Sequence, residues 1–324
     1  MTEPEGRATP GVGEAGPVRG AHRFSHAAMA TVFEVHCVHP DVRYAAQAAQ
    51  AAFEVVDRLE QELSRFVGNS DIARINGLAA GESTRVSPST MECLEIARGL
   101  YDLTGRSFDV SIGSGLESLE LDPDAFTVRA EANGVRLDLG GIGKGYAVDR
   151  VAEVMEEWEI PHALVHGGFS SVLALEAPPG RDGWPLTLSA PGSGEQEVLA
   201  RLSARQVAFS ASGTQKGAHI VDPRTGHAVH DRAAWASLAR PPGSEARTGS
   251  SETSRSAAAI AEGLSTAFMI LPVEDVAGVC ERCPGLEAWL LREPQEEGEA
   301  AALLHLIAPG AESEGSRRGG RKKE

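Results

Sequence analysis

The sequence predicts an α+β fold, because segments with strand periodicity and segments with helix periodicity are mixed without the regular alternation of a doubly wound sheet. Ala30–Val38 (ATVFEVHCV) alternates apolar and polar residues and is rich in residues that favour strands, which predicts an opening strand. Arg43–Phe66 instead places apolar residues at helical spacing, which predicts a long amphipathic helix. Mixed sheets flanked by helices are therefore expected.

Capping residues and short apolar runs predict the other elements. Ser70 stands directly before Asp71, and Ser87 directly before Pro88–Leu103, so each serine is placed to cap the start of a helix. Two more helices and five short strands complete the expected order: helices Gly145–Trp158 and Glu262–Leu271, and strands Val135–Leu139, His162–Val165, Ser171–Leu175, Leu186–Leu188 and Val207–Ser210.

Composition divides the chain into one folded domain and three weakly structured segments. Residues 1–20 are rich in Gly, Pro and Glu and predict a disordered leader without a signal peptide. Residues 309–324 are rich in Gly, Ser and Arg and predict a basic disordered tail. Residues 240–256 predict a flexible loop inside the domain, which is expected to span residues 21–308.

The charge balance excludes several classes of partner. The chain has 30 basic and 46 acidic residues, a net charge of −16, and such a surface repels phosphate backbones and anionic lipids. No run of 18 apolar residues is present to span a bilayer. Four cysteines give no disulfide framework, which favours a reducing compartment. The expectation is a cytoplasmic protein that binds neither nucleic acid nor membrane; the sequence does not define its oligomeric state.

The most informative segment is Leu137–Asp149 (LDLGGIGKGYAVD), which predicts a strand, a glycine turn and the start of a helix. Glycines allow backbone to approach a ligand closely, and a helix N-terminus attracts anions. The glycine spacing does not match a dinucleotide-binding G-x-G-x-x-G, and Lys144 is followed by Gly145 rather than the Ser or Thr of a P-loop. These residues alone leave two readings open, an anion site or a tight connection.

Seven segments in a fixed order carry a resemblance to a known family. They are MAT (29–31), LSRFVGNSDIARIN (63–76), GRSFDVSIG (105–113), LDLGGIGKGYAVD (137–149), VHGGFSSVLAL (165–175), AHIVDPRTG (218–226) and AEGLSTAFMIL (261–271). This pattern resembles the FAD:protein FMN transferases, the ApbE-type flavin transferases once described as thiamine-biosynthesis lipoproteins. The resemblance implies a two-lobed, T-fold-type α+β architecture with FAD between the lobes.

The resemblance also implies a magnesium ion at the FAD pyrophosphate. Its ligands fall on the backbone carbonyl of Gly141 and the side chains of Glu262 and Thr266. Spacing of i and i+4 puts the latter two on one helix face, and oxygen ligands suit Mg²⁺. The family usually has Asp where this chain has Glu262, so the carboxylate reaches about 1.5 Å further, a departure to which the strict octahedral geometry of Mg²⁺ is sensitive. The alternative is that Glu262 begins a helix and favours its dipole.

Eight residues are implied as the FAD site by the same resemblance. Phe66 stands where the family often has Tyr, which keeps the stacking face and loses a hydroxyl; alone, it would be interpreted as a core aromatic. Lys144 is placed to act on a phosphate as a point charge. The full implied set is Met29, Phe66, Ser107, Phe108, Asp109, Asp138, Lys144 and Ile220.

The implied reaction transfers FMN from FAD to a Thr or Ser hydroxyl of an acceptor protein and releases AMP. Lys144 and His219 are the candidate catalytic residues, with His219 as the base because imidazole titrates near neutral pH; a structural His219 is the alternative. The sequence does not identify the acceptor protein. Two other functions stay open: an FAD pyrophosphatase that forms free FMN and AMP, and a non-catalytic FAD-binding protein.

Overall fold

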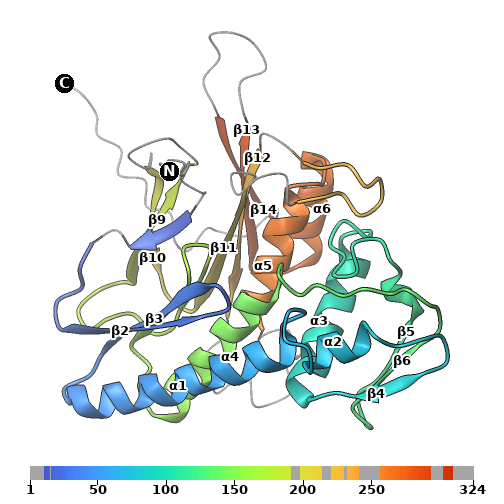
Figure 1. Ribbon diagram of the computed structural model, residues 1–324. Coiled ribbons are helices and arrows are strands. Elements are labelled where there is room, and N and C mark those ends of the chain that lie inside the picture. The colour runs from blue at the N-terminus through green and yellow to red at the C-terminus, as the bar shows by residue number, and fades with distance from the viewer. Residues whose placement is uncertain are drawn as a thin grey trace, which may run out of the picture.

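A computed structural model describes residues 11–14, 16–190, 198–213, 220–229, 232–240, 256–292 and 302–308. It confirms the α+β class, with an eight-stranded antiparallel sheet at its centre (Figure 1). In spatial order the sheet consists of β14 (Ala302–Ile307), β13 (Leu286–Arg292), β12 (Arg232–Ala239), β11 (Val207–Gly213), β8 (Ser171–Ala174), β7 (Ala163–Gly167), β3 (Thr31–Val38) and β2 (Ala21–Ala28).

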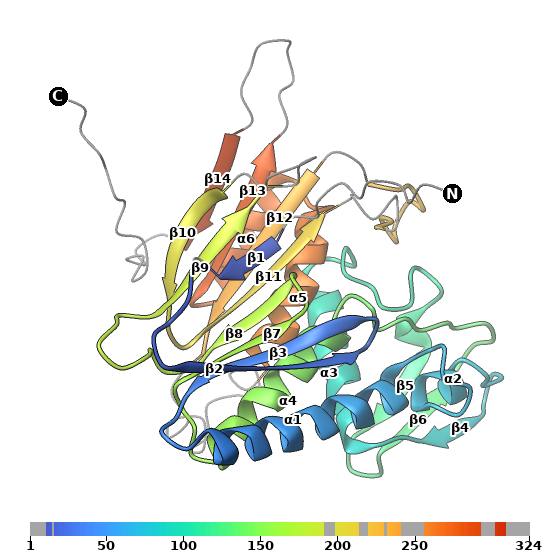
Figure 2. The same cartoon turned by 60° about the vertical axis from the view of Figure 1, so that its left-hand side comes forward.

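Two three-stranded sheets accompany the large one. The first consists of β1 (Gly11–Glu14), β9 (Trp184–Ser189) and β10 (Val198–Ala204), and Figure 2 shows it in front of the large sheet. The second consists of β4 (Ser83–Arg85), β6 (Thr127–Ala130) and β5 (Leu119–Asp122), beside α2 and α3 in Figure 1. Its connection from α3 includes a 3₁₀ turn at Leu116–Ser118.

Strand periodicity gives the large sheet two apolar faces. In β11, Ala208 and Phe209 point into different clusters, and in β12 Ala234 and Trp235 do the same, because successive side chains alternate between faces. The face carrying Phe209 and Trp235 packs against Trp184 and the other apolar residues of the first small sheet. The opposite face packs against helices.

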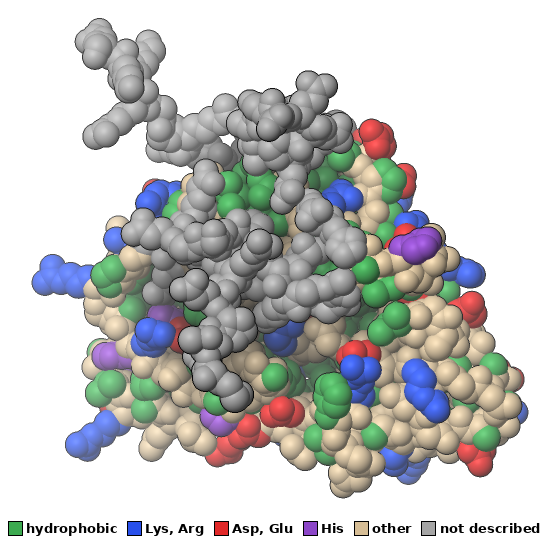
Figure 3. All heavy atoms as spheres, turned by 45° about the horizontal axis from the view of Figure 1, so that its top comes forward, with side chains coloured by type: hydrophobic (Ala, Val, Ile, Leu, Met, Phe, Trp, Pro, Cys, Tyr) green, Lys and Arg blue, Asp and Glu red, His purple; other side chains and the backbone are tan. Residues whose placement is uncertain are grey.

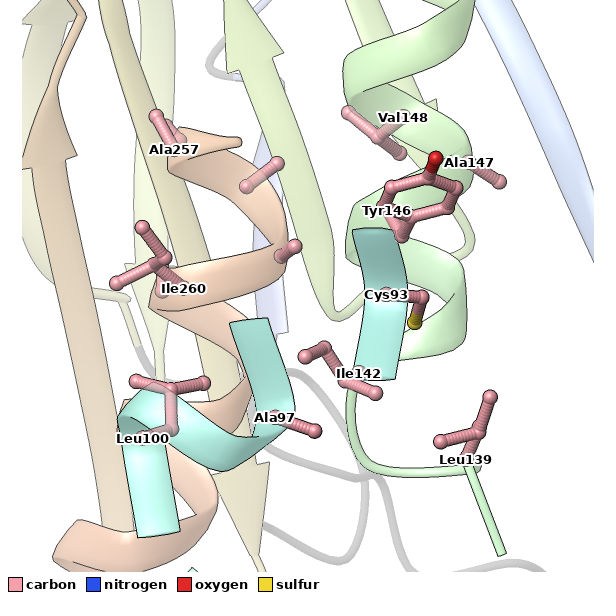
Figure 4. Packing of buried hydrophobic residues seen from close by; sticks show 14 of the residues in the cluster. Cys93, Ala97, Leu100, Leu139, Ile142, Tyr146, Ala147, Val148, Ala257 and Ile260 are labelled. Carbon is pink, nitrogen blue, oxygen red and sulfur yellow. The ribbon is translucent and has the colours of Figure 1, made fainter. Parts of the chain in front are cut away.

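The helical layer brings together segments far apart in the sequence. It consists of α1 (Val42–Leu63), α2 (Asp71–Ile75), α3 (Pro88–Leu103), α4 (Gly143–Glu157), α5 (Ala257–Phe268) and α6 (Val273–Arg282). Helix α4 contacts β7 and β8, α5 contacts β11 and β12, and the two helices contact each other. In Figure 4, Cys93 and Ala97 of α3 lie against Ile142, beside the start of α4.

The closeness of α4 and α5 depends on Gly145. A Cβ atom at this position would lie 2.3 Å from the carbonyl oxygen of Ala258, far inside van der Waals contact. Only glycine therefore allows the backbones of α4 and α5 to meet here.

Capping residues and periodic apolar patterns predicted several elements correctly. The hydroxyl of Ser70 accepts the N–H of Ala73 at 2.9 Å, and that of Ser87 accepts the N–H of Thr90 at 3.1 Å, so both predicted helix caps are confirmed. The strand predicted at residues 30–38 and the helix predicted at residues 43–66 appear as β3 and α1 with small shifts at their ends.

The strand expected at Val135–Leu139 is wrong. Residues 135–139 belong to no sheet in the described chain, because a side chain takes the place of a neighbouring strand. The amide of Asn76 donates to the carbonyl of Leu137 at 3.0 Å, and its oxygen accepts the N–H of Leu137 at 2.6 Å. The helix expected from Glu262 begins five residues earlier, with α5 at Ala257.

The segments predicted to be weakly structured fall partly within the described residues. Residues 11–14, in the predicted leader, form β1 and pair with β9, a contact that their composition does not indicate. Arg240, at the edge of the predicted loop, is buried and donates two hydrogen bonds to Glu156, of 2.7 and 2.9 Å. Residues 1–10, 241–255 and 309–324 lie outside the described residues.

The outer surface carries charges of both signs. Figure 3 shows basic and acidic side chains scattered over the described part of one face. Within the described residues, no helix is both long and apolar enough to cross a bilayer.

Candidate active site

The glycine turn leads directly into α4. The N–H groups of Ile142 and Gly143 donate to the carbonyl of Leu139 at 3.1 and 2.8 Å, which closes the turn. Ile142 has no side chain that caps the helix, and the carboxylate of Glu262 on α5 supplies this function instead. Its Oε2 accepts the N–H of Gly145 at 2.6 Å. A helix N-terminus favours an anion, so the position of Glu262 has a direct electrostatic cause.

Lys144 and Glu262 form an ion pair at this helix start. The ammonium group of Lys144 contacts Oε1 of Glu262 and also donates to the carbonyl of Gly140 at 3.3 Å. Glu262 is buried, whereas a quarter of the Lys144 side chain is exposed. The structure thus brings together two residues that lie 118 positions apart and that sequence analysis assigned to one site.

The other two predicted metal ligands lie beside this pair. Thr266 donates to the carbonyl of Glu262 at 3.1 Å, and its hydroxyl lies 3.3 Å from that of Ser212. A Cβ atom on Gly141 would lie 3.8 Å from the Thr266 hydroxyl, which puts the turn next to this face of α5.

The donor chemistry of this region suits magnesium. A carboxylate, a hydroxyl and a turn carbonyl are oxygen ligands of the kind that Mg²⁺ prefers. Within the described residues, no three His, Cys, Asp or Glu side chains are grouped so that they could hold a metal ion. Both carboxylate oxygens of Glu262 already have protein donors, so a metal ion bound by this carboxylate would share it with Lys144 or displace the ammonium group.

Of Ser107, Phe108 and Asp109, the structure places Phe108 against the glycine turn. Phe108 is buried, and its ring carbon Cε2 would lie 3.4 Å from a Cβ on Gly141. The Ser107 hydroxyl is buried and lacks a hydrogen-bond partner within the described chain. Asp109 accepts the N–H groups of Ser111 and Gly113 at 2.7 and 2.8 Å, so in this structure it stabilises its own loop.

Phe66 is not a core aromatic, because it is 83% exposed. The preceding residue, Arg65, was missed by sequence analysis. Its guanidinium lies over the Phe66 ring, and its Nε lies 3.3 Å from Asp138 Oδ2. Asp138 also accepts the N–H of Gly140 at 2.9 Å, which links all of these residues to the glycine turn. Arg65 stands between Ser64 and Phe66 in the motif at residues 63–76, and this position was the feature of the sequence that could have identified it as a site residue.

Met29 and Ile220 belong to the apolar core rather than to these polar contacts. Met29 adopts a left-handed φ of 49° in the turn between β2 and β3 and packs against the main core. Ile220 is buried in the same core cluster as Phe108. His219 lies outside the described residues, so its proposed role as a base stays a prediction.

Asp149 is a further buried carboxylate that sequence analysis did not single out, although it ends the glycine motif. Its two oxygens accept the N–H groups of Ala258 and Ala259 at 3.0 and 2.9 Å, at the first turn of α5. Burial raises the pKa of Asp149 to about 7, because removal from water disfavours the charged form.

Known proteins match this chain in sequence and in fold. A protein from Treponema pallidum named FAD:protein FMN transferase is 24% identical over 309 residues, covering 80% of this chain and 81% of the relative. One of the same name from Klebsiella pneumoniae is 24% identical over 215 residues, covering 55% of this chain and 66% of the relative.

Solved structures of flavin transferases have a fold similar to that of this chain. The flavin transferase ApbE from Vibrio cholerae superimposes with a TM-score of 0.74 at 17% identity, covering 88% of this chain and 97% of the other. The apo flavinyl transferase ApbE of Pseudomonas stutzeri gives 0.71 at 19% identity, covering 88% and 94%. The sequence pattern of the ApbE family matches residues 29–290, most of the folded domain, and the chain therefore belongs to the ApbE family.

Proposed function

We propose that this protein is an FAD:protein FMN transferase. It transfers FMN from FAD to a Thr or Ser hydroxyl of an acceptor protein and releases AMP, with Mg²⁺ as cofactor. The observation that carries this proposal is the meeting of Lys144, Glu262 and Thr266 beside the glycine turn that begins α4. A glycine turn at a helix N-terminus is suited to a phosphate group. The names of the relatives support the choice of reaction.

The proposed FAD site lies between two lobes. One contains the large sheet with α4 and α5, and the other contains α2, α3 and the sheet of β4, β5 and β6. Magnesium would be held by the Gly141 carbonyl, Glu262 and Thr266. When bound, the ion acts as a Lewis acid that polarises the pyrophosphate and neutralises charge on the leaving AMP. Lys144 binds phosphate oxygen as a point charge.

The reaction is a displacement at the phosphorus on the FMN side of the pyrophosphate. The acceptor oxygen forms a bond to this phosphorus, the bond from phosphorus to the bridging oxygen breaks, and AMP leaves with the bonding electron pair. The hydroxyl proton goes to His219, because a neutral imidazole accepts a proton near pH 7. The product is a phosphoester that links FMN to the acceptor protein.

A flavin-labelling experiment tests this proposal. The purified chain is incubated with FAD and MgCl₂, with and without a protein extract dialysed free of flavin as the source of acceptor. Nucleotides are then separated by chromatography, and proteins are examined by in-gel flavin fluorescence. We expect AMP and a fluorescent protein band only when extract is present. FMN and AMP formed without extract identify a pyrophosphatase instead, and FAD recovered intact in both reactions identifies a non-catalytic binder.

The metal assignment is tested in the same assay. EDTA is expected to stop the release of AMP, and Glu262→Ala is expected to remove most turnover and its dependence on divalent ions while the circular dichroism spectrum is retained. Turnover that EDTA does not change would contradict the magnesium site.

The proposed compartment is the reducing cytoplasm. All four cysteines are free thiols, three of them buried, as expected without oxidative folding. Cell fractionation tests this: recovery of the chain in an exported or membrane fraction, cleaved near its N-terminus, would contradict it.

A further inference from the structure

Arg65 and Phe66 form an exposed cation–aromatic pair directly after α1. The guanidinium carbon of Arg65 lies 4.7 Å from the centre of the Phe66 ring, and 45% of the Arg65 side chain is exposed. A guanidinium stacks well on an aromatic face, and stacking restricts its orientation. The pair is therefore an oriented positive group that solvent and ligands reach.

Asp138 ties this positive group to the glycine turn. One oxygen of Asp138 lies 3.3 Å from Arg65 Nε, and the other accepts the N–H of Gly140. The carbonyl of Gly140 in turn accepts a hydrogen bond from Lys144. Arg65 thus belongs to the same contact chain as the lysine proposed to bind phosphate, although it lies 79 positions earlier in the sequence.

Arg65 keeps unused binding capacity. It donates no hydrogen bond that meets ordinary geometry within the described chain, and its contact with Asp138 is through Nε. An exposed ion pair of this kind is weak, so a ligand with a stronger negative charge can compete with Asp138 for Arg65. Lys144, by contrast, is paired with the buried carboxylate of Glu262. The turn therefore has a second cation, with a planar fork of donors that matches phosphate oxygens.

We propose that Arg65 binds the pyrophosphate of FAD through its terminal nitrogens, while Phe66 and Asp138 hold its guanidinium in place. This inference rests on the proposed function, because it takes FAD to be the ligand of this turn. The chemistry recognised is a nucleoside diphosphate group, so ADP is expected to use Arg65 in the same way. Riboflavin, which has no phosphate, is not.

Binding measurements with three ligands test the proposal without turnover. Dissociation constants of FAD, ADP and riboflavin are measured by calorimetry and flavin fluorescence in the presence of MgCl₂. Because a hydrogen bond between charged groups is among the stronger ones, Arg65→Ala is expected to weaken the binding of FAD and of ADP by about 10-fold or more. Riboflavin binding is expected to change less than about 2-fold. Arg65→Lys retains the positive charge but loses the planar set of N–H donors. Its affinity for FAD and ADP is expected to lie between those of the wild type and Arg65→Ala.

Arg58 supplies the matched control, because it is an exposed arginine on α1. Arg58→Ala removes the same charge from the chain and is expected to leave all three dissociation constants within about 2-fold, since exposed charges about a Debye length away are screened. Equal weakening of all three ligands by Arg65→Ala would overturn the inference, and so would no weakening at all. A wild-type chain that binds neither FAD nor ADP would instead overturn the proposed function.

Discussion

The carboxylate of Asp149 on α4 accepts the N–H of Ala258 at the start of α5, while Glu262 of α5 accepts the N–H of Gly145 at the start of α4. The two helices thus cap each other. Neither Ile142 nor Ser256, the residues before the two helices, contributes a side-chain cap. Because both capping contacts join α4 to α5, they fix the position of the Glu262 carboxylate relative to the glycine turn.

Removal of the Asp149 carboxylate is expected to destabilise the fold. Asp149→Ala leaves the buried N–H groups of Ala258 and Ala259 without acceptors, and each such group costs about 1–3 kcal/mol. We expect the free energy of unfolding at pH 6 to fall by at least about 2 kcal/mol, measured by urea denaturation. Glu157→Ala is the control, since this carboxylate is exposed at the end of α4. It is expected to change stability by less than about 0.5 kcal/mol.

Stability is expected to fall as pH rises from about 4 to about 7. The pKa of Asp149 is raised from its usual 3.8 to about 7 in the folded protein. Between these values the folded state holds a proton that the unfolded state has released, so each pH unit within this window removes up to about 1.4 kcal/mol. Asp149→Asn cannot titrate and is expected to lack this part of the slope. Identical slopes for wild type and Asp149→Asn would exclude Asp149 as the cause.

Gly145 is expected to tolerate no side chain, whereas Gly99, another helical glycine, is expected to tolerate one. Gly145→Ala puts a methyl group 2.3 Å from a backbone oxygen of α5 and is expected to cost about 3 kcal/mol of unfolding free energy. Gly99 on α3 has open space around its Cα, so Gly99→Ala is expected to stabilise by about 0.5–1 kcal/mol. The melting temperatures of the two variants are expected to move in opposite directions; a stable Gly145→Ala protein would contradict the close approach.

Glu262 is one methylene longer than the Asp that is usual in the family, and the positions of Lys144 and Gly145 are expected to suit this length. Glu262→Asp withdraws the carboxylate by about 1.5 Å from Lys144 and from the N–H of Gly145, a shift of the size to which Mg²⁺ coordination is sensitive. We therefore expect lower turnover or weaker affinity for Mg²⁺. Initial rates are measured against Mg²⁺ concentration, with saturating FAD and the dialysed extract as acceptor. A clear gain for Glu262→Asp would mean that Glu262 impairs the enzyme, and would favour a binding protein.

Local chemistry determined much of this protein from the sequence alone. The caps at Ser70 and Ser87 were predictable because a capping hydroxyl and the N–H that it accepts lie three residues apart. The side-by-side placement of Glu262 and Thr266 followed from helical spacing, once Glu262 was assigned to a helix. The ordered motifs identified the family, although identities are as low as 17–24%.

The tertiary structure decided what depends on contacts between distant segments. The side chain of Asn76 takes the place of the strand expected beside Leu137, although the two residues are 61 positions apart in the sequence. Arg65 contacts Asp138, which is 73 positions away. The reciprocal capping of α4 and α5 likewise has no local signal, because each carboxylate binds N–H groups more than 100 positions away. A periodic pattern reports which face of an element is buried, but it does not report which distant backbone group that face will meet.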